Sequence, residues 1–210
     1  MNRQKIMLLI LLSLLGLITA CTTEAKGQDA SIKEGELTDY ERSLTDMVSE
    51  NFFVYDVEFL NDNATTINLK VDYYQEGEHI DTIIDLASSL EDIEKNSEVR
   101  LLFMSTPFQD QEKWDAAIIT ENGMASTTVD EGLPKIEEEG GISGYTGQTE
   151  LKIGEETIIG SVVKSDRDTI TSPVNMDTEE GLKKATSYEH VFILSATLKD
   201  CPIGDAGCAE

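Results

Sequence analysis

The sequence predicts a mainly β (α+β) fold, an antiparallel β-sandwich-like domain with an N-terminal amphipathic helix and a short helix before the last strand. Short apolar runs with a period of two residues recur along the chain and are separated by turn sequences. Apart from one ambiguous segment at 79–86, helical patterns are confined to two segments, one near each end of the domain. Strands that follow one another through turns are typical of antiparallel sheets.

The first predicted element is a helix that begins near Leu37. Thr38 or Asp39 is suited to cap its first turn. An apolar stripe continues at helical spacing, and its members are Leu37, Tyr40, Leu44, Met47 and Val48.

A β-hairpin is expected next. Two runs with alternating apolar residues flank the turn sequence at 61–63, and a second turn follows at 76–78. The segment 79–86 fits a helix or a strand, and its position directly after a hairpin and a tight turn favours a strand. The alternating apolar positions are Phe53, Tyr55, Val57 and Phe59, then Ile67, Leu69, Val71 and Tyr73.

Further strands are predicted at 99–105 and 113–120, separated by Pro107, with Trp114 in the core. Residues 121–147 carry many glycines, Pro134 and three consecutive glutamates, which favours a long irregular stretch with room for an edge strand. The remaining elements are expected as strands at 149–153 and 157–164, a helix at 178–186 and a last strand at 189–198. The single folded domain is therefore expected to span residues 37–200, followed by a tail at 201–210.

The N-terminus has the pattern of an export signal. Arg3 and Lys5 precede an apolar run from Ile6 to Leu17 that is shorter than the roughly 18 to 20 residues of a membrane-spanning helix. The run ends in Leu17-Ile18-Thr19-Ala20-Cys21, which resembles the lipobox of bacterial lipoproteins, although Ile18 stands where leucine is commoner. An ordinary signal peptide cleaved after Ala20 is the alternative.

This resemblance implies that residues 1–20 are removed and that Cys21 carries diacylglycerol, with its freed amine available for a fatty acid such as palmitate. The expected location is the extracytoplasmic face of the cell membrane, and the plan is similar to that of small lipoproteins of Gram-positive bacteria. The polar residues at 21–36 are expected to form a flexible tether. The sequence leaves a Gram-negative host open.

Acidic residues dominate the exported part. Without residues 1–20 the chain keeps 14 of its 16 basic and all 41 of its acidic residues, a net charge of −27. Such a charge disfavours nucleic acid and anionic lipid surfaces as partners. Two explanations of this negative charge are open: a need for solubility, or the binding of cations or basic partners.

Two further cysteines, Cys201 and Cys208, flank six residues at the C-terminus. Export favours a disulfide between them, which would constrain the tail. Free thiols, or a metal or redox pair, are the alternatives, but the closer CxxC spacing of such pairs is absent.

Catalytic patterns are weak. Ser161 and Lys164 match S-x-x-K, but a strand would place them on opposite faces, and the partner motifs S-D-N and K-T-G are absent. Ser143 lies in G-x-S-x-Y, where a nucleophile elbow needs a second glycine. His79 and His190, the chain's two histidines, are expected to be exposed and structurally neutral.

The acidic loops at 61–63 and 166–168 lack the ligand series of a calcium-binding EF-hand loop, and phosphate-binding glycine motifs are missing. We therefore expect no enzyme activity, no metal and no cofactor. The function expected is a membrane-anchored module that binds an envelope protein or peptide. The alternatives are a cation-binding or structural lipoprotein, or a hydrolase that uses Ser161 or Ser143.

Overall fold

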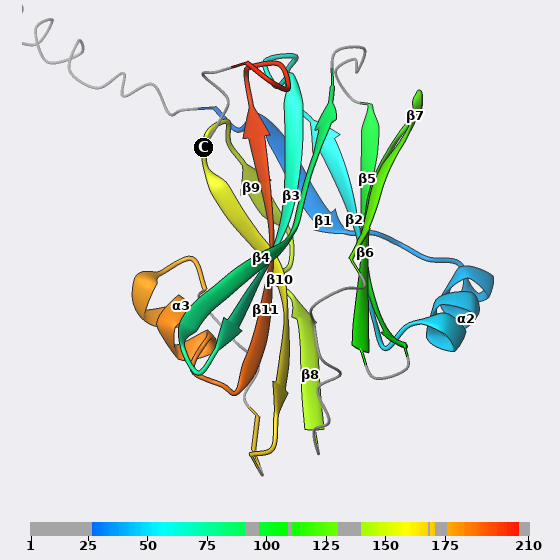
Figure 1. Ribbon diagram of the computed structural model, residues 1–210. Coiled ribbons are helices and arrows are strands. Elements are labelled where there is room, and N and C mark those ends of the chain that lie inside the picture. Colours follow the sequence, from blue (N-terminus) through cyan, green and yellow to red (C-terminus); the bar gives the residue numbers. More distant parts are fainter. Residues whose placement is uncertain are drawn as a thin grey trace, which may run out of the picture.

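The computed structural model describes residues 27–90, 97–108, 111–129, 140–167, 169–170 and 176–205. These residues form two sheets that stack face to face, with one helix on the outer side of each sheet (Figure 1). The predicted β-sandwich-like architecture is therefore confirmed. In chain order the elements are β1 (Ala30–Glu34), α2 (Asp39–Val48), β2 (Asn51–Phe59), β3 (Thr66–Gln75), β4 (Glu78–Ser89), β5 (Glu98–Phe108), β6 (Gln111–Thr120), β7 (Gly123–Val129), β8 (Gly140–Tyr145), β9 (Thr149–Leu151), β10 (Glu156–Ser165), α3 (Glu179–Ala185) and β11 (His190–Lys199).

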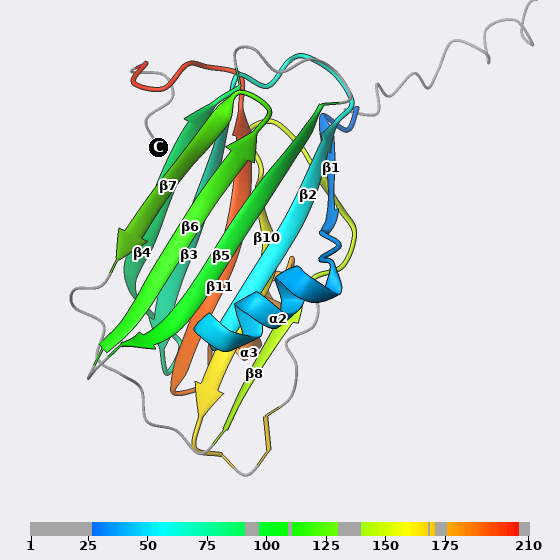
Figure 2. The same ribbon diagram turned by 90° about the vertical axis from the view of Figure 1, so that its right-hand side faces the viewer.

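The strand order is β7-β6-β5-β2-β1-β9 in the six-stranded sheet A and β4-β3-β11-β10-β8 in the five-stranded sheet B. Neighbouring strands pair antiparallel in both sheets. The chain forms hairpins at β3–β4, β5–β6 and β6–β7. One side of the sandwich is bordered by β4 and β7, which lie next to each other (Figure 2).

The main core lies between the two sheets. The alternating residues of β3 point inward as predicted, and Ile67, Leu69 and Val71 are fully buried. Trp114 of β6 is also fully buried and lies against Phe192 of β11, with ring centroids 4.8 Å apart. Each such side chain contributes about 1.5–3 kcal/mol through burial, so this core is the main source of stability.

An aromatic side chain links the two sheets near β8. The Tyr55 hydroxyl of β2 donates a hydrogen bond of 2.7 Å to the carbonyl of Ile159 in β10. A Cβ atom at Gly160 would lie 2.4 Å from that hydroxyl oxygen. The absence of a side chain at Gly160 therefore allows the close approach of the sheets.

Both predicted helices are present, and both begin with a threonine cap. Thr38 and Glu41 form a reciprocal capping box at the start of α2, while the Thr178 hydroxyl accepts from the Gly181 amide in α3. Ala185 of α3 is buried in a second apolar cluster on the outer face of sheet B. No residue of α2 is buried. The helix α3 is therefore attached to its sheet by apolar burial, whereas α2 is not.

The segment 79–86, which fitted either a helix or a strand, lies within β4. It follows a turn in which Glu76 and Gly77 have φ angles of 50° and 90°. Positive φ at both central residues is the geometry of two-residue hairpin turns, which explains why a strand follows.

The tether predicted at 21–36 is too long, because residues 30–34 form β1. Ala30 and Ile32 are buried, and β1 pairs with β2 on one side and with β9 on the other. Two apolar positions are too few to show a period of two, so this strand depends on partners distant in the sequence. The ordered domain begins before Leu37.

Two strands lie in the stretch predicted to be irregular, β7 and β8. β7 is rich in serine and threonine, pairs with β6 alone and exposes most of its residues. β8 contains three glycines and pairs with β10. Both lack alternating apolar residues because they lie at sheet edges. Pro134 and the acidic residues 137–139 lie outside the described residues.

Pro107 was predicted to separate two strands, but it belongs to β5. Its partner in β6 is Glu112, while the pairing of β5 with β2 ends at Ser105. Proline cannot donate a backbone hydrogen bond, and it is tolerated here because no strand of the described residues pairs with this end of β5 on its β2 side.

Candidate functional site

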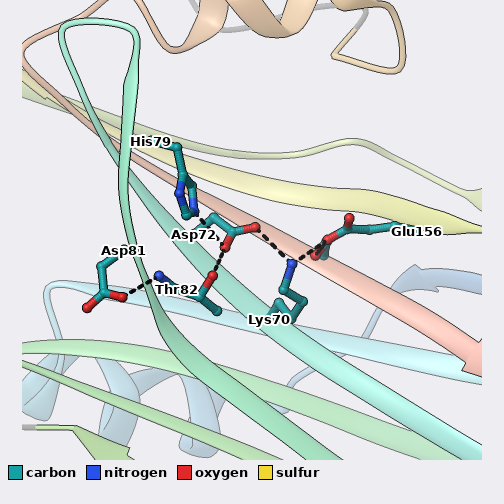
Figure 3. A network of polar contacts seen from close by, with 7 residues as sticks. Lys70, Asp72, His79, Asp81, Thr82 and Glu156 are labelled. Atoms are coloured by element: carbon teal, nitrogen blue, oxygen red, sulfur yellow. Dashed lines mark hydrogen bonds and ion pairs between the residues drawn. The ribbon is translucent and has the colours of Figure 1, made fainter. Parts of the chain in front are cut away.

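A group of polar side chains lies on the outer face of sheet B, and we call it the polar network (Figure 3). In β3, Lys70 and Asp72 alternate with the inward-pointing core residues and therefore face outward. Their neighbours across the sheet in β11 are Ser195 and Ile193. The members of the polar network are Lys70, Asp72, His79, Thr82, Glu156 and Ser195.

Asp72 is the centre of this network. Its Oδ1 accepts a 2.5 Å hydrogen bond from the Thr82 hydroxyl and lies 3.2 Å from Nε2 of His79. Its Oδ2 lies 3.4 Å from the Lys70 ammonium nitrogen. With these three partners and a side chain only 11% exposed, Asp72 positions its neighbours.

Glu156 is the outward-facing member. Its Oε1 accepts a 2.6 Å hydrogen bond from Ser195 and lies 3.4 Å from Lys70, yet its side chain is 47% exposed. Burial alone would lower the pKa of Lys70, but the carboxylates of Asp72 and Glu156 outweigh it and raise that pKa above its usual value. Lys70 therefore stays charged and is held within the network.

A groove of about 990 Å³ adjoins the polar network and runs between α3 and the loop before β10. Its lining contains five carboxylates, which we call the acidic wall, one basic residue, Lys152, and several apolar side chains, which we call the apolar floor. The carboxylates are Asp72, Glu150, Glu155, Glu156 and Asp177, and the apolar side chains include Tyr74, Ile158, Met176, Leu182 and Ile193.

The floor of the groove belongs to the apolar cluster beneath α3. Met176 is buried there, and Tyr74, Ile158 and Leu182 are partly buried against the same cluster. Burial raises the pKa of Tyr74, and the nearby Asp72 and Glu156 raise it further, so the Tyr74 hydroxyl stays neutral. The groove thus combines a fixed apolar surface with a negatively charged wall.

The edge of β10 forms one side of this groove. β8 pairs with β10 only from Gly160 to Ser165. Along residues 156–158, which line the groove, no strand among the described residues pairs with β10 on that side. Backbone groups point alternately to the two sides of a strand, so this stretch can accept a further strand.

A family model for the YgaN domain matches residues 31–198. The chain belongs to the YgaN domain family. No curated protein and no solved structure matches it. The matched range begins inside β1 and ends inside β11, so the groove and the polar network lie within the YgaN domain.

The two serines named from the sequence lie on strands of this YgaN domain. Ser161 is 2% exposed in β10, and Ser143 in β8 pairs with Val162. Val162 belongs to the core and Val163 to the outer cluster, so Ser161 and Lys164 point to opposite faces, as the strand prediction required. Lys164 forms an ion pair with Glu112, at 2.8 Å.

The prediction that both histidines are exposed and neutral in their structural role is wrong for His190. Its Nδ1 lies 2.7 Å from the Tyr73 hydroxyl, and its ring stacks on the Tyr73 ring. Burial lowers the pKa of His190. His79 is exposed, but it contacts Asp72 and so belongs to the polar network of the YgaN domain.

Cys201 is disulfide-bonded, while Cys208, its predicted partner, lies outside the described residues, as does Cys21 with the signal peptide. The pairing and the lipid anchor therefore stay predictions. No helix in the described part of the YgaN chain is long and apolar enough to span a membrane.

Lys70 and Asp72 alternate with the apolar positions Leu69, Val71 and Tyr73, so the strand pattern predicts that they lie on its polar face, but no motif in the sequence assigns them to a site. Glu156 and the floor residue Met176 were missed altogether, because α3 and β10 come together with β3 only in the folded YgaN domain. Among the described residues, no three His, Cys, Asp or Glu side chains are grouped as a metal site would require.

Proposed function

We propose that the protein is a lipid-anchored extracytoplasmic binding module and that the groove on sheet B binds an extended basic peptide. The observation that carries this proposal is the groove itself, in which an acidic wall and an apolar floor adjoin a stretch of β10 that pairs with β11 but has no partner strand on its other side among the described residues. No catalytic step is assigned to it.

The negative charge of the groove favours a basic ligand. Five carboxylates and Lys152 line the groove, and the nearby Lys70 is already engaged by Asp72 and Glu156. Lysine or arginine side chains of a ligand would meet the negative wall, while apolar side chains would cover Tyr74 and Ile158. Complementary potential of this kind speeds association and excludes acidic competitors.

The stretch of β10 that pairs on one side only supports an extended ligand. A peptide that adds to a sheet edge gains affinity from main-chain hydrogen bonds and specificity from alternate side chains. Both features of the groove, its acidic wall and its open edge, then contribute to one binding mode. An isolated cation would use the first feature alone.

The proposed anchor rests on the lipobox-like sequence that ends at Cys21. From Cys21 to the start of β1 at Ala30 the chain makes nine steps. Nine fully extended residues span at most about 30 Å. An anchored domain would therefore stay close to the membrane surface and would sample peptides and protein segments in the envelope.

The groove is tested with a labelled hexapeptide that alternates lysine and valine. We expect it to bind the intact protein in fluorescence anisotropy, and the glutamate-valine counterpart not to bind. A lysine-valine peptide with alternate backbone nitrogens methylated keeps the charge but cannot complete a β-ladder, so it should bind several-fold more weakly.

Charge reversal locates the binding site. The Glu150→Lys/Glu155→Lys variant changes two carboxylates of the groove and is expected to weaken peptide binding at least tenfold. Glu98→Lys/Glu121→Lys makes the same change at two exposed positions, in β5 and in the turn between β6 and β7, that do not line the groove. Equal losses in both variants would show non-specific attraction to an acidic protein and would contradict the proposed site.

The anchor is tested by intact mass and membrane fractionation of the native protein beside Cys21→Ala. The expected result is a mass increase that fits diacylglycerol, together with loss of processing or release of the variant from the membrane. An unmodified chain that starts at Cys21 and is found in the medium would contradict the anchor and leave the groove proposal standing.

A further inference from the structure

The helix α2 presents its apolar face to solvent. Tyr40, Leu44, Met47 and Val48 are 72%, 44%, 81% and 56% exposed, although they form the single apolar stripe of this amphipathic helix. Figure 2 shows α2 on the outer side of sheet A, in front of the lower part of β2. We call these four side chains the α2 stripe.

The polar side of the helix faces the domain instead. Arg42, Thr45, Asp46 and Ser49 line a cavity of about 210 Å³ whose other wall includes Tyr145. Thr45 and Ser49 are only partly exposed. The helix is therefore oriented opposite to the usual arrangement, in which the apolar stripe of a surface helix packs on the core.

The ends of α2 are fixed, although its apolar face is uncovered. The Thr38 capping box holds the first turn, and the Thr106 hydroxyl of β5 donates to the Val48 carbonyl at 3.1 Å. A helix of ten residues is marginally stable in water without packing of its apolar face. Within the described residues nothing supplies that packing, which favours an external partner.

We propose that α2 is a recognition helix whose stripe docks into an apolar, basic-rimmed groove of another protein. The stripe residues stand at i, i+4, i+7 and i+8, the spacing with which a helix anchors itself in such a groove. The helix and its flanks carry five exposed carboxylates against Arg42, and these are Glu36, Asp39, Glu41, Asp46 and Glu50. A basic rim around the partner's groove would complement these carboxylates.

The same charges disfavour the other occupants of an exposed apolar helix. Helices that lie in membrane interfaces carry mainly lysine and arginine on their polar face, whereas α2 is acidic. In a symmetric dimer through α2 the same patch would meet itself, so its carboxylates would be brought together. A basic protein partner avoids both penalties.

The test places the photo-crosslinking residue p-benzoylphenylalanine at Met47 of the full-length protein in its native cells. The matched control carries it at Met124, which is 65% exposed on the edge strand β7. We expect one protein adduct specific to position 47, and mass spectrometry should locate the crosslink on a partner segment that combines apolar residues with lysine or arginine.

The adduct should fall at least tenfold with Leu44→Glu, which introduces a charge into the stripe. Leu44 is not buried, so the variant should keep the melting temperature of the parent protein. If it does not, Val48→Glu replaces it. The purified partner should bind the parent protein at least tenfold more tightly than the glutamate variant.

Several results would overturn the proposal. They are an adduct to lipid, an adduct to a second copy of the chain, equal adducts at both positions, no adduct, and an adduct that persists in the glutamate variants. None of these depends on the groove of sheet B, so the two proposals succeed or fail separately.

Discussion

Lys164 and Glu112 form an ion pair in the interior of the sandwich. Lys164 of β10 is 3% exposed and Glu112 of β6 is 2% exposed, and their charged atoms lie 2.8 Å apart. Glu50 provides a second, half-exposed carboxylate at 3.3 Å. Among the described residues, the Oε1 atom of Glu112 has no hydrogen-bond partner. Because both charges are removed from water, each is stabilised by the opposite charge of its partner.

Removal of one partner should be far more harmful than removal of both. Lys164→Met leaves the Glu112 carboxylate buried without its cation, and we expect the free energy of unfolding to fall by about 3–5 kcal/mol. Urea unfolding at neutral pH measures this loss. Lys164→Met/Glu112→Leu should recover most of it, and a double variant as unstable as the single one would contradict this interpretation.

His190 makes the stability of the domain depend on pH. Burial lowers its pKa, the positive charge of Lys164 adds to this effect, and the carboxylates of Glu189, Glu112 and Glu76 oppose it. The pKa in the folded state therefore lies below the unfolded value of about 6.5. As the pH falls, His190 takes up a proton at a higher pH in the unfolded chain than in the folded protein. The stability that is present above the unfolded pKa is therefore lost as the pH falls through the folded pKa.

The variant His190→Phe tests this dependence, because it keeps an aromatic ring beside Tyr73 but does not titrate. From about pH 7.5 to about pH 5, the urea midpoint of the native protein should fall more steeply than that of the variant. The carboxylates contribute to both curves, so the difference reports His190. Parallel curves would show that His190 does not contribute.

At the scale of the element, the two capped helices should respond differently to the loss of their caps. Thr38→Ala removes the capping box of α2, which costs about 0.5–2 kcal/mol of helix stability. Since α2 buries no residue, the loss should stay local. We expect faster hydrogen exchange of the amides from Arg42 to Val48, with an unchanged global unfolding midpoint.

Thr178→Ala is the matched change at α3. That helix buries Ala185 in the cluster on sheet B, so loss of its cap should lower the global midpoint as well as local protection. If Thr38→Ala also lowered the global midpoint, α2 would have to be packed on the domain, which would contradict its exposed orientation.

The sequence predicts elements well where the pattern is local. The capped helix, the alternating strands β2 and β3 and the last strand follow from residue spacing, and so does the position of Trp114 in the core. β1, β7 and β8 were missed because their short or glycine-rich sequences become strands only through pairing with distant partners. The spacing of the α2 stripe shows that one face is apolar, but it does not show which way that face points.

The candidate site shows the same limit. Lys70 and Asp72 were expected on the polar face of β3 from alternation alone. Glu156 joins them through the pairing of β10 with β11, and Met176 and Leu182 complete the groove through the docking of α3. These contacts join segments far apart in the chain, and no motif in the sequence marks them.

At the scale of the whole molecule, the acidic charge opposes compactness. The chain carries a net charge of −25, so folding brings many carboxylates together. Salt screens exposed charges and has less effect on buried pairs such as Lys164 and Glu112. The Debye length falls from about 30 Å at about 0.01 M to about 3 Å at about 1 M ionic strength.

We therefore expect the unfolding midpoint to rise as sodium chloride is added over that range, because repulsion among surface carboxylates is reduced. Glu150→Lys/Glu155→Lys lowers the net negative charge by four, so its midpoint should rise less. Binding of the lysine-valine peptide should respond in the opposite direction and weaken with salt, since screening reduces its attraction to the groove. Peptide affinity that increased with salt would mean that the apolar floor, and not the acidic wall, selects the ligand.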